Sequence, residues 1–152
     1  MSPPLRQARG FTLTELVAVM VVAVIIAVFT VTVFDRRSFD AAGFADEVRA
    51  QLAYAQKVAV GARRIVTATV SGNTVALTMC TGFPVCGSTV PVASPQGESD
   101  FVRQAPGGVS IGPDAVLSFD PLGKPSAGAL FTVSGGGSAH HVIVEAGTGY
   151  VH

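Results

Sequence analysis

The N-terminal part of the chain holds one long apolar run. Residues 16–34 contain no charged residue, no Gly and no Pro. Nineteen helical residues span roughly 28 Å, which is close to the roughly 30 Å thickness of a hydrocarbon core. A buried core helix is the alternative, but helices of globular proteins are seldom apolar on every face over about five turns. The pattern therefore predicts a membrane-spanning helix.

A second, different helical pattern follows the apolar run. Small and apolar residues recur at intervals of three and four positions, which places them on one helical face; they are Ala41, Ala45, Val48, Leu52, Ala55, Ala59 and Ala62. Charged residues fall largely on the other faces, and we expect the helix to end near Gly61. A helix unbroken from about residue 13 would be roughly 70 Å long. Half of it would have to contact lipid or other copies of the chain.

Beyond Arg64 the pattern changes to short strands and turns. It predicts strands at 65–70, 74–80, 108–112, 115–119, 129–133, 141–146 and 149–152. The turn signals SGN (71–73) and SGGGSA (134–139) predict a hairpin and a flexible hairpin loop, and residues 81–107 read as a long irregular loop. The predicted fold is therefore α+β. A long N-terminal α-helix, membrane-spanning in its first half and amphipathic in its second, packs through its alanine face on a C-terminal antiparallel β domain.

Charge argues against a nucleic-acid-binding protein. The 152 residues carry a formal net charge of zero, and without residues 1–10 eight basic residues face ten acidic ones, a net charge of −2. Nucleic-acid-binding proteins usually show a basic excess or stripe. Arg63 and Arg64 stand at the expected helix end, where basic side chains interact favourably with the helix dipole. A DNA contact is the alternative for these two arginines.

The only two cysteines, Cys80 and Cys86, enclose the five residues TGFPV. A single pair suits an oxidising compartment, and we expect a disulfide that closes this loop. Two free cysteines are the alternative. A metal site is not favoured, because His140, His141 and His152 show no zinc-like spacing with the cysteines.

No catalytic motif is present in the sequence. His140 and His141 stand near Glu145, but adjacent residues of a strand point to opposite faces. The sequence lacks Gly-x-Ser-x-Gly, His-Glu-x-x-His and phosphate-loop patterns. The Gly-rich SGGGSA precedes a predicted strand, whereas a phosphate cradle precedes a helix. We therefore expect no enzymatic activity, no cofactor and no metal.

Glu15 lies where the predicted membrane helix begins. An ionised carboxylate inside a membrane is costly, and less so near a helix end. By its position alone, Glu15 either lies at the interface beside the positive end of its own helix or has a specific partner. Residues 1–10 form a basic leader that ends in Gly10, so cleavage there would leave the apolar run in the mature chain, unlike cleavage of a secretory signal.

The segment RGFTLTELVAV (9–19) resembles the class III signal of type IV pilins and type II secretion pseudopilins. The shared features are a basic leader, a Gly, Phe-Thr-Leu-x-Glu and an apolar helix. The resemblance implies that a prepilin peptidase cleaves between Gly10 and Phe11 and that Phe11 becomes N-methylated. It also implies that Glu15 pairs with the Phe11 ammonium of a neighbouring subunit.

The rest of the chain resembles the GspH/FimT group of minor pilins. LAYAQKVAVGARRIVTATV (52–70) is similar to the helix-to-strand junction of that group, and LSFDPLGKP (117–125) and IVEAGTGYVH (143–152) are similar to its last strands. FADEVRAQLAYAQKVAV (44–60), together with the terminal TGYVH, looks most like the minor pilin of mannose-sensitive haemagglutinin (MSHA)-type pilus systems.

These resemblances imply a division of the chain. Residues 1–10 form a cleaved class III leader, 11–34 a transmembrane or filament-core helix, 35–62 its amphipathic half, and 63–152 a periplasmic β domain. The implied function is that of a minor pilin or minor pseudopilin, a structural subunit of a type IV (MSHA-like) pilus or type II secretion pseudopilus. The alternative is a competence-type minor pilin whose β domain binds DNA during uptake.

The resemblance also implies the location and the partners of the protein. It would be a single-pass protein of the bacterial inner membrane, with its C-terminal domain in the periplasm, and would then enter the pilus or pseudopilus. Its partners would be other major and minor pilins or pseudopilins, the prepilin peptidase, the inner-membrane assembly platform and the membrane itself.

Overall fold

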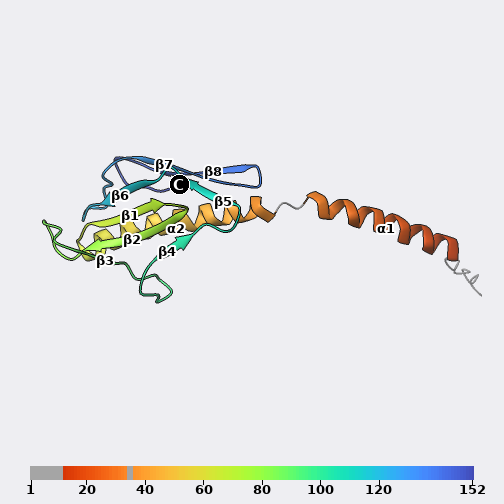
Figure 1. The fold of residues 1–152 in the computed structure, drawn as a ribbon, viewed down its shortest axis with the longest axis horizontal. Helices are drawn as coiled ribbons and strands as arrows, with labels where there is room; N and C mark the ends of the chain where they lie inside the picture. Colours follow the sequence, from red (N-terminus) through yellow and green to blue (C-terminus); the bar gives the residue numbers. More distant parts are fainter. Residues whose placement is uncertain (1–11, 34–35) are drawn as a thin grey trace, which may run out of the picture. The chain divides into compact units, whose positions relative to one another are not determined.

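The computed structural model describes residues 12–33 and 36–152. The chain divides into two compact units, Met1–Asp35 and Arg36–His152. The first contains helix α1 (Leu13–Val33), and the second contains helix α2 (Arg36–Ala62) and eight strands (Figure 1). The expected unbroken helix includes residues 34 and 35, which lie outside the described residues, as do the leader and its cleavage site.

Helix α1 is apolar along its length, with Glu15 as the acidic residue of its first turn. The predicted membrane span, residues 11–34, extends beyond the described residues at both ends. In the described part of the chain, no helix reaches the combined length and hydropathy that a membrane crossing requires.

Helix α2 buries one face, as its spacing predicts. The buried residues are Ala41, Phe44, Ala45, Val48, Gln51, Leu52, Ala55 and Ala59. Ala62, expected on the same face, is exposed because it lies in the last turn, beyond the covering strands. Phe44 and Gln51 were not anticipated, although both lie three residues from a predicted face position. Because most residues of the face are small, the helix axis can approach the sheets closely.

The helix ends at Ala62, one residue after Gly61, with a cap at Arg63. Arg63 has a positive φ of 53°, its N–H donates to Val60 O (3.3 Å), and the Arg64 N–H donates to Ala59 O (3.1 Å). These two bonds form the Schellman pattern that usually places Gly in the left-handed position. Gly61 itself is helical, and the helix ends next to it, as expected.

Eight strands form two antiparallel sheets against α2 (Figure 1). The larger sheet has the order β3-β2-β1-β6, with β4 also paired to β2; its strands are β1 (Val66–Ser71), β2 (Thr74–Cys80), β3 (Thr89–Pro91), β4 (Val102–Gln104) and β6 (Ala115–Phe119). The smaller sheet has the order β5-β7-β8, with β5 (Val109–Gly112), β7 (Ala129–Gly135) and β8 (Ser138–Val144). Buried and less buried residues alternate along β1 and β7, so each sheet turns one face to the core.

Both predicted hairpins have two-residue turns. Gly72 and Asn73 join β1 to β2 with φ values of 55° and 65°, and Gly136 and Gly137 join β7 to β8 with 57° and 79°. Positive φ at both central positions is the geometry that matches strand twist. SGGGSA therefore forms the predicted hairpin, but its turn has only two residues and the others belong to the strands. The Asn73 Oδ1 also accepts from the Ile111 N–H (3.1 Å), and this bond ties the first hairpin to the smaller sheet.

The segment 81–107 is more ordered than its Pro, Gly and Ser content predicts. It contains β3 and β4, which pair with opposite ends of β2. Val92, Ser94 and Phe101 are buried along it. The expectation of one long irregular loop was therefore wrong. The short strands escaped notice because three residues are too few to show a period.

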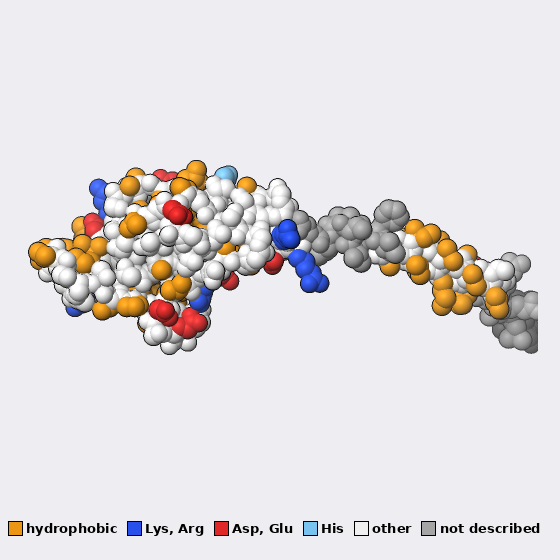
Figure 2. Space-filling model, viewed as in Figure 1, with side chains coloured by type: hydrophobic (Ala, Val, Ile, Leu, Met, Phe, Trp, Pro, Cys, Tyr) orange, Lys and Arg blue, Asp and Glu red, His pale blue; other side chains and the backbone are white. Residues whose placement is uncertain are grey.

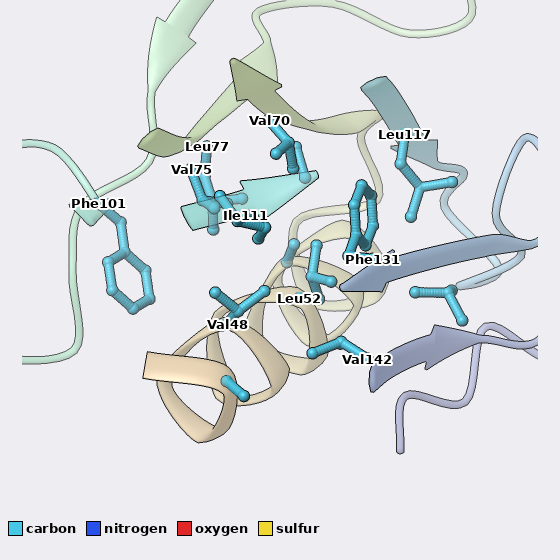
Figure 3. Packing of buried hydrophobic residues seen from close by; sticks show 14 of the residues in the cluster. Val48, Leu52, Val70, Val75, Leu77, Phe101, Ile111, Leu117, Phe131 and Val142 are labelled. Atoms are coloured by element: carbon cyan, nitrogen blue, oxygen red, sulfur yellow. The ribbon is translucent and has the colours of Figure 1, made fainter. Parts of the chain in front are cut away.

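The core lies between α2 and the two sheets. Val48 and Leu52 point from the helix toward side chains of both sheets, among them Leu77, Ile111 and Phe131 (Figure 3). Phe119 and Phe131 are the largest side chains that are fully buried. The core cluster lies entirely within Arg36–His152.

One polar side chain lies inside this apolar core. Gln51 is fully buried, and its Nε2 donates to Val75 O (3.1 Å) and Phe101 O (2.8 Å). Its Oε1 is buried without a hydrogen-bond partner. Gln51 thus joins α2 to β2 and to the segment that leads into β4. A residue that bonds two separate segments fixes their position more narrowly than apolar contact alone.

Gln51→Met should therefore destabilise the Arg36–His152 unit by about 1–2 kcal/mol. Methionine keeps the volume but loses two hydrogen bonds, and losing the unpaired Oε1 offsets part of the cost. Urea unfolding followed by circular dichroism measures the difference. Lys57→Met, an exposed change on the same helix, is the control. Equal midpoints for Gln51→Met and the parent would show that the two bonds contribute nothing.

Candidate assembly site

Helix α1 starts with a cap that places Glu15 in its first turn. Thr12 precedes the helix, and the Glu15 N–H donates to Thr12 Oγ1 (3.3 Å) and to Thr12 O (3.1 Å). The spacing Thr-x-x-Glu is that of a capping box. The capping role of Thr12 was missed in the sequence, although this spacing was its signal. The Glu15 carboxylate thus lies in the turn where the helix dipole is positive.

A shallow apolar groove runs from Glu15 along α1. Its lining residues recur at helical spacing and so share one face: Glu15, Ala18, Val19, Val22, Ala23 and Ile26. The groove has a volume of about 410 Å³. Ala18 and Ala23 lower the helix surface on this face, which lets another helix approach closely. A single carboxylate therefore stands at one end of an apolar, small-residue surface.

The apolar side chains around this groove are not covered. Every residue from 12 to 27 is exposed, and Leu13, Met20 and Val24 are each more than 60% exposed. Monomeric soluble proteins rarely leave a continuous apolar surface of this extent uncovered. An exposed apolar surface of this extent is typical of an interaction surface.

The predicted site residues fall in different places. Gly10 and Phe11 lie outside the described residues, whereas Glu15 is described in unit one. Cys80 and Cys86 belong to the second unit, where their sulfurs are joined at 2.02 Å with a Cα–Cα distance of 5.3 Å. The bond closes the loop that leaves the end of β2.

The histidines have separate surroundings. His141 Nδ1 lies 3.2 Å from Thr132 Oγ1, and His152 Nε2 lies 3.3 Å from Glu145 Oε1. His140, on the opposite face of β8 from His141, has a buried Nε2 without a hydrogen-bond partner. In the described ranges, no three His, Cys, Asp or Glu side chains are placed to hold a metal ion.

Surface ion pairs hold local segments of the second unit. Arg49 pairs with Asp46 and also donates to His141 O (2.7 Å), which links α2 to β8. Arg103 donates to the Glu98 carboxylate (3.1 Å), and this bond, with a further one from Ser94, lowers the pKa of Glu98. Exposed pairs of this kind contribute little to stability. Their main consequence is that these charges are already neutralised locally.

Comparison with known proteins identifies the fold. No family model matches the sequence, and curated proteins gave no significant match. The type IV minor pilin FimU of Pseudomonas aeruginosa (strain PAO1), in its P21 crystal form, superposes with a TM-score of 0.50 at 18% identity, covering 71% of this chain and 83% of that one. Its P65 crystal form gives 0.49 at 18% identity, over 71% and 87%. The likeness to the first of these structures shows that the chain has a pilin-like α+β fold.

Proposed function

We propose that the protein is a minor pilin or minor pseudopilin, a structural subunit of a type IV pilus or a type II secretion pseudopilus. The observation that carries the proposal is the position of Glu15. Its carboxylate stands in the first turn of an exposed apolar helix, at the head of a groove, in a chain with a pilin-like fold. This arrangement suits a subunit that packs by its helix.

Membrane storage is the first stage of the proposed function. In the precursor, α1 and its flanking residues 11–34 span the inner membrane, and the Arg36–His152 unit lies in the periplasm. Glu15 is then near the bilayer edge, where the cost of its charge is smallest and the helix dipole compensates part of it. Lipid covers the apolar surface that the chain itself leaves exposed.

Processing is the second stage. A prepilin peptidase cleaves after Gly10 and methylates the new N-terminus. The cleavage creates a positively charged ammonium on Phe11, four residues before Glu15. In an assembled filament, the Phe11 ammonium of one subunit meets Glu15 of another inside an apolar core. Removing one partner of a buried charge pair typically costs about 3–5 kcal/mol, because it leaves the other charge uncompensated. Such a pair would fix the axial register between subunits.

The proposal also extends to the kind of filament that the subunit joins. The resemblance of residues 44–60 and of the terminal TGYVH supports an MSHA-type pilus. The partners would be the major and minor pilins of that system and its inner-membrane assembly platform. The platform would move the subunit from lipid into the filament, where neighbouring helices replace lipid along the groove.

The mature protein should begin at Phe11 and carry one added methyl group. Intact-mass measurement of protein purified from membranes of a strain with an active prepilin peptidase tests this. The same strain without the peptidase is the control, and it should yield the chain from Met1. If the two strains yield the same unprocessed mass, the pilin assignment fails.

Glu15→Val should leave membrane insertion and leader cleavage nearly intact but prevent assembly. The Gly10–Phe11 junction survives and the helix becomes more apolar, whereas the Phe11 ammonium of the neighbouring subunit loses its partner. The measurements are co-purification with partner pilins and complementation of a strain that lacks the protein, at matched membrane abundance.

Glu15→Gln and Thr14→Val serve as matched variants. The first keeps the shape of the side chain and removes its charge, so it should fail as Glu15→Val does. The second changes the neighbouring residue and should complement. Full complementation by Glu15→Val would mean that Glu15 is only a helix-end residue.

A further inference from the structure

Three loops meet at the end of the second unit where α2 terminates. The Cys80 N–H donates to Ile65 O (2.9 Å), so the disulfide loop leaves beside the residues that follow α2. The Gln56 Nε2 donates to Gly123 O and to Thr148 O, both at 2.8 Å, which holds two turns against the last part of the helix. We call this region the tip; it consists of residues 57–65, 80–88, 120–125 and 145–149.

The tip exposes large apolar side chains on two of its loops. Phe83 is 59% exposed and Val85 77% exposed on the loop closed by the disulfide, and Leu122 is 89% exposed on its turn. Figure 2 shows apolar side chains at the end of the second unit where this loop projects, with basic side chains on both sides of them. Both loops that carry these side chains are constrained. The disulfide closes one loop, and the Asp120 Oδ1 accepts from the Leu122 and Lys124 N–H groups of the other.

Basic residues outnumber acidic ones in the tip. Half of the eight basic residues beyond the leader lie in the tip: Lys57, Arg63, Arg64 and Lys124. The tip holds two acidic residues, Asp120 and Glu145. Asp120 is engaged with backbone N–H groups, and Glu145 lies against His152. Among the described residues, none of the four cations has an ion-pair partner within 4 Å.

The helix dipole alone does not account for this surface. The dipole at the end of α2 explains Arg63 and Arg64 but not Lys124, which lies on a separate turn. Outside the tip, the second unit carries six acidic and four basic residues, so its excess of negative charge is only two. Asp46 is paired with Arg49, and Glu98 with Arg103. A partner that complements the tip brings both negative charge and an apolar interior.

We propose that the tip binds the surface of a membrane that contains anionic lipid. Phe83, Val85 and Leu122 enter the boundary between headgroups and acyl chains, and Arg63, Arg64 and Lys124 contact lipid phosphates. Apolar residues that insert beside basic residues are the usual basis of interfacial binding. Side chains this exposed enter lipid without any rearrangement of the core. They project from turns, and so form a convex surface that suits a deformable lipid layer.

The test uses the full-length protein held in nanodiscs of neutral phosphatidylcholine. Binding of these discs to separate vesicles is measured, with pure phosphatidylcholine vesicles compared with vesicles in which about a third of the lipid is phosphatidylglycerol. The discs should bind the anionic vesicles and not the neutral ones, and empty discs should bind neither. Added salt should weaken the binding.

Two pairs of variants separate the parts of the surface. Arg63→Gln with Lys124→Gln should weaken binding roughly thirtyfold, at about fivefold for each charge removed. Phe83→Ser with Leu122→Ser should weaken it at least tenfold at unchanged charge. The matched controls, Arg36→Gln and Val116→Ser, change an exposed cation and an exposed apolar residue outside the tip and should bind as the parent does. Circular dichroism confirms folding in each case.

Two results would overturn the proposal. One is unchanged binding of the variant that carries both Phe83→Ser and Leu122→Ser. Binding that does not need these apolar side chains would be charge attraction without insertion into the lipid. The other is binding of soluble double-stranded DNA or polyglutamate as tight as that of anionic vesicles at equal charge concentration, which would indicate a polyanion partner and no lipid surface.

Discussion

The second unit depends on the close approach of α2 to two sheets at once. Its small residues, such as Ala41, Ala45 and Ala55, are completely buried and leave room for the larger Val48 and Leu52 to reach both sheets. Each sheet alone would present one bare apolar face, and the helix covers both. The Asn73 side chain and the Gln51 amide then join segments that apolar packing alone would leave free to slide.

In the first unit, by contrast, the apolar surface of the helix is left exposed. Helix α1 has an apolar surface on every face, and its residues 12–27 are all exposed. The capping bonds at Thr12 place Glu15 in the first turn. The groove runs from Glu15 to Ile26, so one face of the helix has a polar end and an apolar remainder. The proposed assembly follows from these two features, since a lone carboxylate at the head of an apolar groove stabilises only one register of a neighbouring helix.

Much of this architecture was predictable because it rests on period and turn chemistry. The buried face of α2, the strands β1, β2 and β6 and the two glycine-containing hairpins all follow local rules. Other features are decided by distant contacts. The strands β3 and β4 exist only because β2 offers them an edge. The burial of Gln51 depends on carbonyls 24 and 50 positions away. At the candidate site, the role of Glu15 came from family resemblance, while its cap and groove became visible only in three dimensions.

The proposed assembly depends on the Glu15 face of α1 as the surface by which the subunit joins its neighbours. A photo-crosslinking residue at Val22, in the groove, can be compared with one at Val24, which lies on the opposite face and is similarly exposed. In cells with an intact assembly system, the account predicts adducts with partner pilins from position 22 well above those from position 24, and their loss when Glu15 is replaced by Val. Equal adducts from both positions, or adducts from position 22 that persist without Glu15, would contradict it.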